Sequence, residues 1–253
     1  MTAETTVGFV VGDAHVPHQD MAATSVALQI LHDLKPDTLY FNGDMHEGYS
    51  TSRFKQPGSP GPGFRAEIDG CHEFLKLFCA ESPKSKKKFI EGNHEYRLRS
   101  YLNNKGSDIK GAKWLTIVDQ LELKSLGIEY IPAKGSRWFS TWEIATPDLL
   151  VGHFDKTSAI SAYAAKALIE RHGMSLITGH GHSMGVHHRR MTNRIVTAYE
   201  GGCLMTLDPN YQEGNGWKHG VCIYYHVEGH PTQVEQIHIE NGRARFGGRL
   251  YKA

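Results

Sequence analysis

The chain has 253 residues, of which 40% are hydrophobic and 22% are charged, and its formal net charge is +1. This is the composition of an ordinary globular protein, and the near-zero net charge excludes a global attraction to nucleic acid or anionic membranes. No apolar run approaches the roughly 20 residues that span a bilayer, and the N-terminus lacks a signal-peptide pattern. We therefore expect an intracellular protein with no membrane partner. Nucleic acid stays a possible partner, but the net charge does not indicate it.

The predicted elements begin with a pattern that recurs along the chain. A short apolar strand ends, glycine follows within a residue or two, and metal-capable side chains come next. The five strand candidates are GFVV (8–11), TLYFN (38–42), KFIE (88–91), DLLV (148–151) and SLIT (175–178). Glycine at each exit permits a tight turn and a close approach of the backbone. The carboxyl ends of strands are where open α/β sheets bind ligands.

Helical segments separate these strands. Asp20 is a candidate N-cap for a helix over 21–34, and further helices are predicted over 65–80, from 96 to 104, and over 156–173. From about residue 128 onward, short strand candidates predict a second, mixed sheet that packs on the first. The sequence thus predicts an α/β fold. Because no clear linker interrupts it, we expect one domain over residues 1–253. The Pro/Gly-rich residues 50–64 cannot be regular and form a candidate lid.

The polar residues after the strands form a set that could bind metal. Its members are Asp13, His15, Asp44, Asn93, His153, His180 and His182. Carboxylate, amide and imidazole groups without a thiolate suit Mn²⁺, Fe²⁺, Ni²⁺ or Zn²⁺ and argue against a structural cysteine site. In an extended exit, residues i and i+2 project the same way, so Asp13 with His15 and His180 with His182 are expected to converge. Seven ligands suit two ions that share a bridging carboxylate.

Five motifs carry a resemblance to a known family. They read DAH, GDMHE, GNHE, GHF and GHGH, in that order, between residues 13 and 182. In this order they resemble the motifs of the calcineurin-like metallophosphoesterases, and GNHEYRLR after a KKKF strand resembles the phage and prophage branch. The resemblance implies a four-layer α-β-β-α fold, with two mixed sheets packed as a sandwich and flanked by helices.

The resemblance also implies a role for each ligand. Asp13, His15 and His182 would hold the first metal ion, and Asn93, His153 and His180 would hold the second. Asp44 would bridge the two ions, and a bridging hydroxide would attack the phosphorus in line. Manganese is the favoured metal, with iron, nickel or zinc as alternatives.

His94 would act beside the leaving-group oxygen, as general acid or transition-state stabiliser. Glu47 occupies the position of the residue that orients this histidine in relatives, although its side chain is one methylene longer. Arg53 and Arg97 are candidate phosphate ligands because a guanidinium matches phosphate oxygens, with structural ion pairs as the alternative. His46 is either a pocket residue or an exposed loop residue. Residues 187–190, HHRR, are expected in a surface strand.

The resulting functional hypothesis is hydrolysis of a phosphomonoester or a phosphodiester. The alternatives are a DNA or RNA nuclease of the same fold, then a phosphoprotein phosphatase, and outside the enzymes an interaction scaffold that retains its ligands. The cytoplasm is the expected compartment, or the host cytoplasm if a phage encodes the chain. The oligomeric state is not determined by the sequence.

Overall fold

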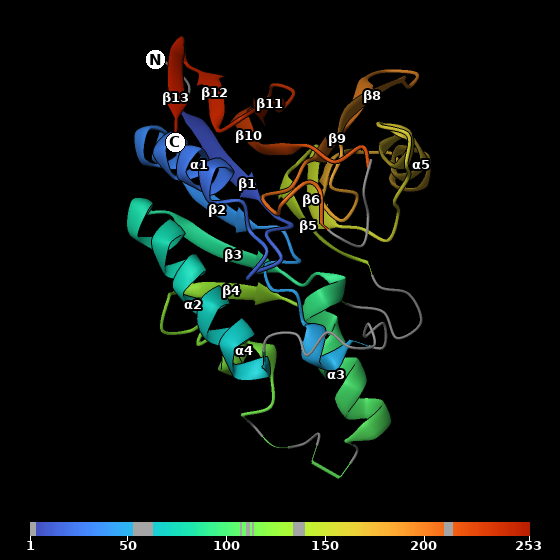
Figure 1. The fold of residues 1–253 in the computed structure, drawn as a ribbon. Coiled ribbons are helices and arrows are strands. Elements are labelled where there is room, and N and C mark those ends of the chain that lie inside the picture. The colour runs from blue at the N-terminus through green and yellow to red at the C-terminus, as the bar shows by residue number, and fades with distance from the viewer. Residues whose placement is uncertain are drawn as a thin grey trace.

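A computed structural model describes residues 4–52, 63–106, 108–109, 112, 114–133, 140–209 and 215–253. Two large β-sheets form its centre, and helices lie on their outer faces (Figure 1). The candidate lid over 50–64 lies largely outside the described residues, because only its two ends are included.

The first sheet has six strands in the order β11-β10-β1-β2-β3-β4. Its parallel strands are β1 (Thr5–Val11), β2 (Thr38–Phe41), β3 (Lys86–Ile90) and β4 (Ile128–Ile131). The strand β10 (His219–Val227) runs antiparallel to β1, and the edge strand β11 (Gln233–Ile239) runs antiparallel to β10. The strand predictions before the first three motifs are therefore confirmed.

The second sheet has five strands in the order β5-β6-β7-β9-β8. They are β5 (Thr141–Thr146), β6 (Leu149–His153), β7 (Ser175–Thr178), β8 (Met184–Arg190) and β9 (Ile195–Gly201). The central strands β6, β7 and β9 run parallel, and each edge strand is antiparallel to its neighbour. A separate hairpin, β12 (Arg243–Phe246) and β13 (Arg249–Lys252), follows a turn at Asn241 and Gly242, which both have positive φ.

The helices are α1 (Met21–Leu34), α2 (Phe64–Glu81), α3 (Asn93–Lys105), α4 (Ile117–Gln120), α5 (Tyr163–His172) and the short 3-10 helix η1 (Tyr49–Thr51). The predicted cap of α1 is confirmed, since the Asp20 carboxylate accepts a hydrogen bond of 2.8 Å from the Ala23 amide. The prediction of a helix from residue 156 was wrong at its start. Ala162 has a φ of 65°, and this left-handed residue separates α5 from the chain before it.

Three groups of buried side chains join the layers. On the outer face of the six-stranded sheet, Phe9 and Phe89 pack with residues of α1 and α2. Between the sheets, Tyr40 of β2 packs with Ile177 of β7. On the far side, Leu168 of α5 packs against the five-stranded sheet. The layers therefore run helix, sheet, sheet, helix, and the predicted sandwich is confirmed. The expectation that the strands from residue 128 onward build the second sheet was wrong in part, because β4, β10 and β11 lie in the first sheet.

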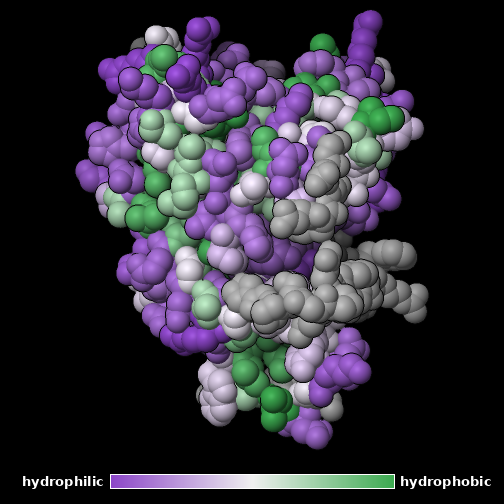
Figure 2. Space-filling view, in the orientation of Figure 1, coloured by the Kyte–Doolittle hydropathy of each residue, from purple (hydrophilic) through white to green (hydrophobic). Residues whose placement is uncertain are grey.

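The face of the molecule shown in Figure 2 is mostly hydrophilic, with apolar residues gathered at its lower end. Large apolar side chains exposed elsewhere in the described chain include Ile160 of the segment before α5 and Ile195 of β9. No described helix is both long and apolar enough to cross a membrane.

The packing of the two sheets can be tested at Ile177. This side chain lies between the sheets and is fully buried, so Ile177→Ala should lower the free energy of unfolding by about 2–5 kcal/mol and Ile177→Val by about 0.5–1.5 kcal/mol. Ile195→Ala makes the same change in the same sheet at a side chain that is 67% exposed, and should cost less than about 0.5 kcal/mol. Urea unfolding measures all three variants, and equal costs at both positions would contradict the sandwich.

Candidate metal centre

The predicted ligands lie where strands of both sheets end. Asp13 follows β1, Asp44 follows β2, and Asn93 follows β3, whereas His153 ends β6 and His180 follows β7. The turns are tied together, since the Asp13 amide donates to the Gly43 carbonyl and the His15 amide to the Asp44 carbonyl, each at 3.0 Å. The candidate site therefore joins the carboxyl ends of strands from two sheets.

The candidate ligands converge through a backbone conformation other than the predicted one. Asp13, His15, Asp44, His180 and His182 all have φ between 47° and 72°, so none of them lies in extended chain. The expectation that residues i and i+2 project together from an extended exit was therefore wrong. Left-handed conformations in residues other than glycine cost on the order of 1–3 kcal/mol each and persist where the surroundings enforce them.

The first group of candidate ligands is Asp13, His15 and His182. Their ligand atoms lie within 4.8 Å of one another, and all three residues are buried. The Nε2 atom of His182 is 3.2 Å from Asp13 Oδ1 and 3.1 Å from His15 Nε2. Both rings thus direct the same nitrogen toward one point, as ligands of a shared ion would.

The second group is Asp44, His153 and His180, again within 4.8 Å. His153 Nε2 is 3.3 Å from Asp44 Oδ2 and 3.1 Å from the side-chain oxygen of Asn93. The same Asp44 oxygen is 3.8 Å from His15 Nε2 of the first group. Asp44 therefore lies between the two groups.

The hydrogen bonds behind two rings fix their tautomers. His15 Nδ1 donates to the Glu47 carboxylate at 2.9 Å, and His153 Nδ1 donates to the Asn42 carbonyl at 2.8 Å. Neither acceptor carries a proton to donate, so Nδ1 of each ring keeps its proton and Nε2 faces the cluster, where a bound cation would take the place of any proton on it. Metal-ligating histidines are oriented in this way.

The electrostatics of the cluster favour a cation. Burial opposes protonation of His153, but the adjacent Asp44 carboxylate outweighs it and raises the pKa of His153 to about 10. Burial likewise opposes ionisation of Asp44, yet His153 and His94 hold the pKa of Asp44 well below its usual value. Burial lowers the pKa of His180 to about 4, which leaves a neutral ring. Facing oxygens and ring nitrogens with this charge balance fit divalent metal ions.

Glu95 is a functional residue that the sequence reasoning missed. Its buried carboxylate accepts hydrogen bonds from the amides of Asp44 and Met45, both at 2.9 Å, and of Gly92 at 2.8 Å. A Cβ at Gly92 would lie 2.2 Å from Asp44 Oδ1, so only glycine allows this approach. The turn that carries Asp44 is thereby fastened to the first turn of α3. The available signal was its position inside the GNHE motif.

His94 is oriented by the main chain of Glu47. His94 Nδ1 donates to the Glu47 carbonyl at 2.6 Å, whereas the Glu47 carboxylate lies 3.6 Å from that nitrogen and bonds His15 instead. Burial lowers the pKa of His94 well below its usual value, so the ring is neutral. Burial raises the pKa of Glu47, but the hydrogen bond from His15 outweighs it, and the pKa falls to about 2.

Arg97, in α3, contacts the same two residues. Its Nη1 donates to the Glu47 carbonyl at 2.7 Å, and its Nη2 donates to His94 Nε2 at 2.7 Å. Arg53 lies outside the described residues. His46 is fully buried and its Nδ1 is 3.1 Å from Glu95 Oε1, so an exposed loop position is excluded.

The HHRR segment lies in edge strand β8. His188 and Arg190 are exposed, whereas His187 and Arg189 are half-buried, which agrees with the predicted surface strand.

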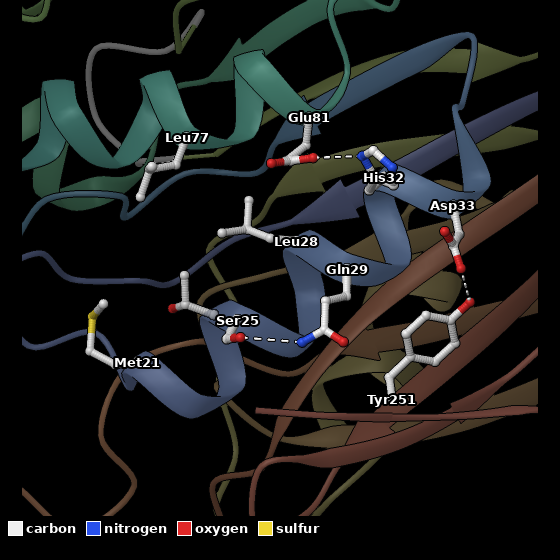
Figure 3. A pocket seen from close by; sticks show the side chains of 10 residues that line it. Met21, Ser25, Leu28, Gln29, His32, Asp33, Leu77, Glu81 and Tyr251 are labelled. Atoms are coloured by element: carbon white, nitrogen blue, oxygen red, sulfur yellow. Dashed lines mark hydrogen bonds and ion pairs between the residues drawn. The ribbon is translucent and has the colours of Figure 1, made fainter.

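A separate cavity of about 400 Å³ lies between α1, α2 and β13 (Figure 3). His32 and Glu81 form a hydrogen bond of 2.8 Å at its edge, and Tyr251 donates to Asp33 at 2.9 Å. None of its lining residues belongs to the five motifs. The cluster at the strand ends is therefore the stronger candidate for chemistry.

Comparison with known proteins agrees with this geometry. The family model of the calcineurin-like phosphoesterases matches residues 9–184. The Gene 54 proteins of Mycobacterium phages L5 and D29 are each 23% identical over 275 residues, which covers 96% of this chain and 97% of theirs. The structure of purple acid phosphatase PPD1 from yellow lupin seeds shares the fold, with 10% identity, a TM-score of 0.50, and coverage of 96% of this chain and 53% of that one. The chain therefore belongs to the calcineurin-like phosphoesterase family and is a metal-dependent phosphoric ester hydrolase.

Proposed function

We propose that the chain hydrolyses a phosphomonoester or a phosphodiester at a centre of two divalent metal ions. The observation that carries this proposal is the position of Asp44 Oδ2, which is 3.3 Å from His153 Nε2 and 3.8 Å from His15 Nε2. One carboxylate oxygen within reach of both ligand groups is the arrangement that a bridging ligand needs.

The ligand assignment follows from the two groups. Asp13, His15 and His182 would hold one ion, Asn93, His153 and His180 the other, and Asp44 both. Mn²⁺ is the favoured metal because the donors are oxygen and imidazole, with Fe²⁺, Ni²⁺ and Zn²⁺ as alternatives. Bound ions would polarise phosphoryl oxygens and lower the pKa of a water molecule.

His94 and Arg97 are proposed to act together on the substrate. Burial keeps His94 neutral, and its Nε2 accepts a hydrogen bond from Arg97. Because Nδ1 donates to the Glu47 carbonyl and Nε2 accepts from Arg97, the neutral ring has no proton for a leaving group, which supports a role in holding the Arg97 guanidinium over a role as general acid. Arg97 contributes a fixed positive charge at the same point, and its guanidinium matches phosphate oxygens.

The compartment is proposed from the relatives, whereas the choice of substrate is left to experiment. Relatives encoded by mycobacteriophages support action in the cytoplasm of an infected host. The metal cluster suits monoesters and diesters alike, so turnover has to decide between them.

The first experiment compares p-nitrophenyl phosphate with bis-p-nitrophenyl phosphate after metal removal and reloading with Mn²⁺. Asp44→Asn should lower kcat/KM by more than about 100-fold, because even the loss of a residue behind a ligand costs about 10–100-fold. Asp69→Asn makes the same change on the exposed face of α2 and should have no effect. Turnover that survives Asp44→Asn, with Mn²⁺, Fe²⁺, Ni²⁺ or Zn²⁺, would refute the assignment.

The two roles of Glu47 can be separated. Glu47→Ala removes the carboxylate that orients His15 but keeps the carbonyl that accepts from His94. The variant should bind Mn²⁺ about 10–100-fold more weakly, and saturating Mn²⁺ should restore most of kcat. His94→Ala should show the reverse, with metal affinity retained and kcat lost. If saturating metal fails to restore Glu47→Ala, the carboxylate acts on catalysis directly.

Arg97 is expected to contribute to transition-state binding. Arg97→Ala should lower kcat/KM by roughly 10–100-fold, since a hydrogen bond to a charged group contributes about 1.5–3 kcal/mol. Arg99→Ala is the matched control, because Arg99 lies in the same helix and bonds Glu91 at 2.6 Å instead of Glu47 or His94. Equal losses in both variants, measured by steady-state kinetics, would mean that Arg97 acts only through the stability of α3.

A further inference from the structure

His182 lacks the support that two other ligand rings have. His15 and His153 each donate the Nδ1 proton to a fixed acceptor. His182 Nδ1 is buried and has no hydrogen-bond partner in the part of the chain that the structure describes. Because such a hydrogen bond normally fixes the orientation of a ligating ring, another contact must orient His182.

The indole of Trp217 makes that contact. Its ring centroid is 4.3 Å from that of His182, and the planes meet at 67°, an edge-to-face arrangement. His15 is the second ring against His182, at 4.9 Å and 67°. Edge-to-face pairs are a favoured aromatic geometry, so Trp217 limits rotation of the imidazole.

Trp217 is itself held by the chain around the site. The amide of the next residue, Lys218, donates to the His182 carbonyl at 2.9 Å, and the Cys203 amide donates to the Lys218 carbonyl at 3.0 Å. The adjacent Leu204 amide donates to the carbonyl of Asp13, at 3.1 Å. The segment that carries the indole is thus fastened to the backbone of two ligands in the first group.

We propose that Trp217 is a positioning residue for the metal ion held by Asp13, His15 and His182. Ring packing takes the part that a hydrogen-bond acceptor plays for His15 and His153. The first ion depends on Trp217, and the second, held by Asn93, His153 and His180, does not. The inference rests on the proposed metal centre.

The test measures metal binding to the full chain, without turnover. Mn²⁺ is titrated into metal-stripped protein, free Mn²⁺ is followed by electron paramagnetic resonance, and retained metal is counted by mass spectrometry after gel filtration. Trp217→Ala should weaken one of two ions by about 10–100-fold and leave the other unchanged. Trp217→Phe, which keeps a ring at this position, should restore affinity to within a few-fold of wild type.

Trp142→Ala is the matched control. It removes an indole that packs edge-to-face on His172, a histidine outside the motifs, at 5.6 Å and 75°. This variant should bind both ions normally even if its melting temperature falls. His182→Ala gives the reference for loss of the first ion.

Three results would overturn the inference: wild-type affinity for both ions in Trp217→Ala, equal weakening in Trp142→Ala, or no rescue in Trp217→Phe. A wild-type chain that binds no divalent ion would refute the metal centre itself, and this outcome is distinct because it precedes any variant.

Discussion

The structure has to hold atoms together that repel one another in the absence of a cation. In a buried space, His153 Nε2 lies 3.3 Å from Asp44 Oδ2 and 3.1 Å from the side-chain oxygen of Asn93. Neither oxygen can donate a proton and Nδ1 already donates to Asn42, so His153 Nε2 must either carry a proton itself or share a metal ion with these oxygens. The pKa of His153 is raised for the same reason, because in the absence of a metal ion a proton on the ring balances the charge of the Asp44 carboxylate.

Such an arrangement persists only if the surrounding backbone is rigid. The sandwich provides this, since strands buried on both faces end in turns that bond to one another. Asp13 bonds the Gly43 turn, and Glu95 holds the Asp44 turn to α3 by accepting hydrogen bonds from the amides of Asp44 and Met45. The left-handed residues are therefore a consequence of the site, because the turns must bring ligands inward within very few residues.

The sequence predicts what is local and periodic. The strands before the five motifs and the Asp20 cap follow from apolar runs, glycines and capping chemistry, so they could be predicted from the residues. The layer order came from the resemblance of the motifs to a known family. The start of α5 could not, because a left-handed Ala162 has no sequence signature. Nor could the partner of His94, since the choice between the carbonyl and the carboxylate of Glu47 depends on the path of one turn. The role of Glu95 was missed for the same reason, since it holds the Asp44 turn through backbone amides, whose positions the sequence does not give.

Glu47 contacts residues from two other motifs of the site. Its carboxylate orients His15 in the first ligand group, and its carbonyl accepts from both His94 and Arg97. A shift of this one residue would therefore alter a proposed metal ligand and the two groups proposed to contact substrate. The carboxylate bonds His15, and the carbonyl of the same residue holds His94 and Arg97. Glu47, which departs from the family pattern by one methylene, therefore connects the two parts of the site through two different groups.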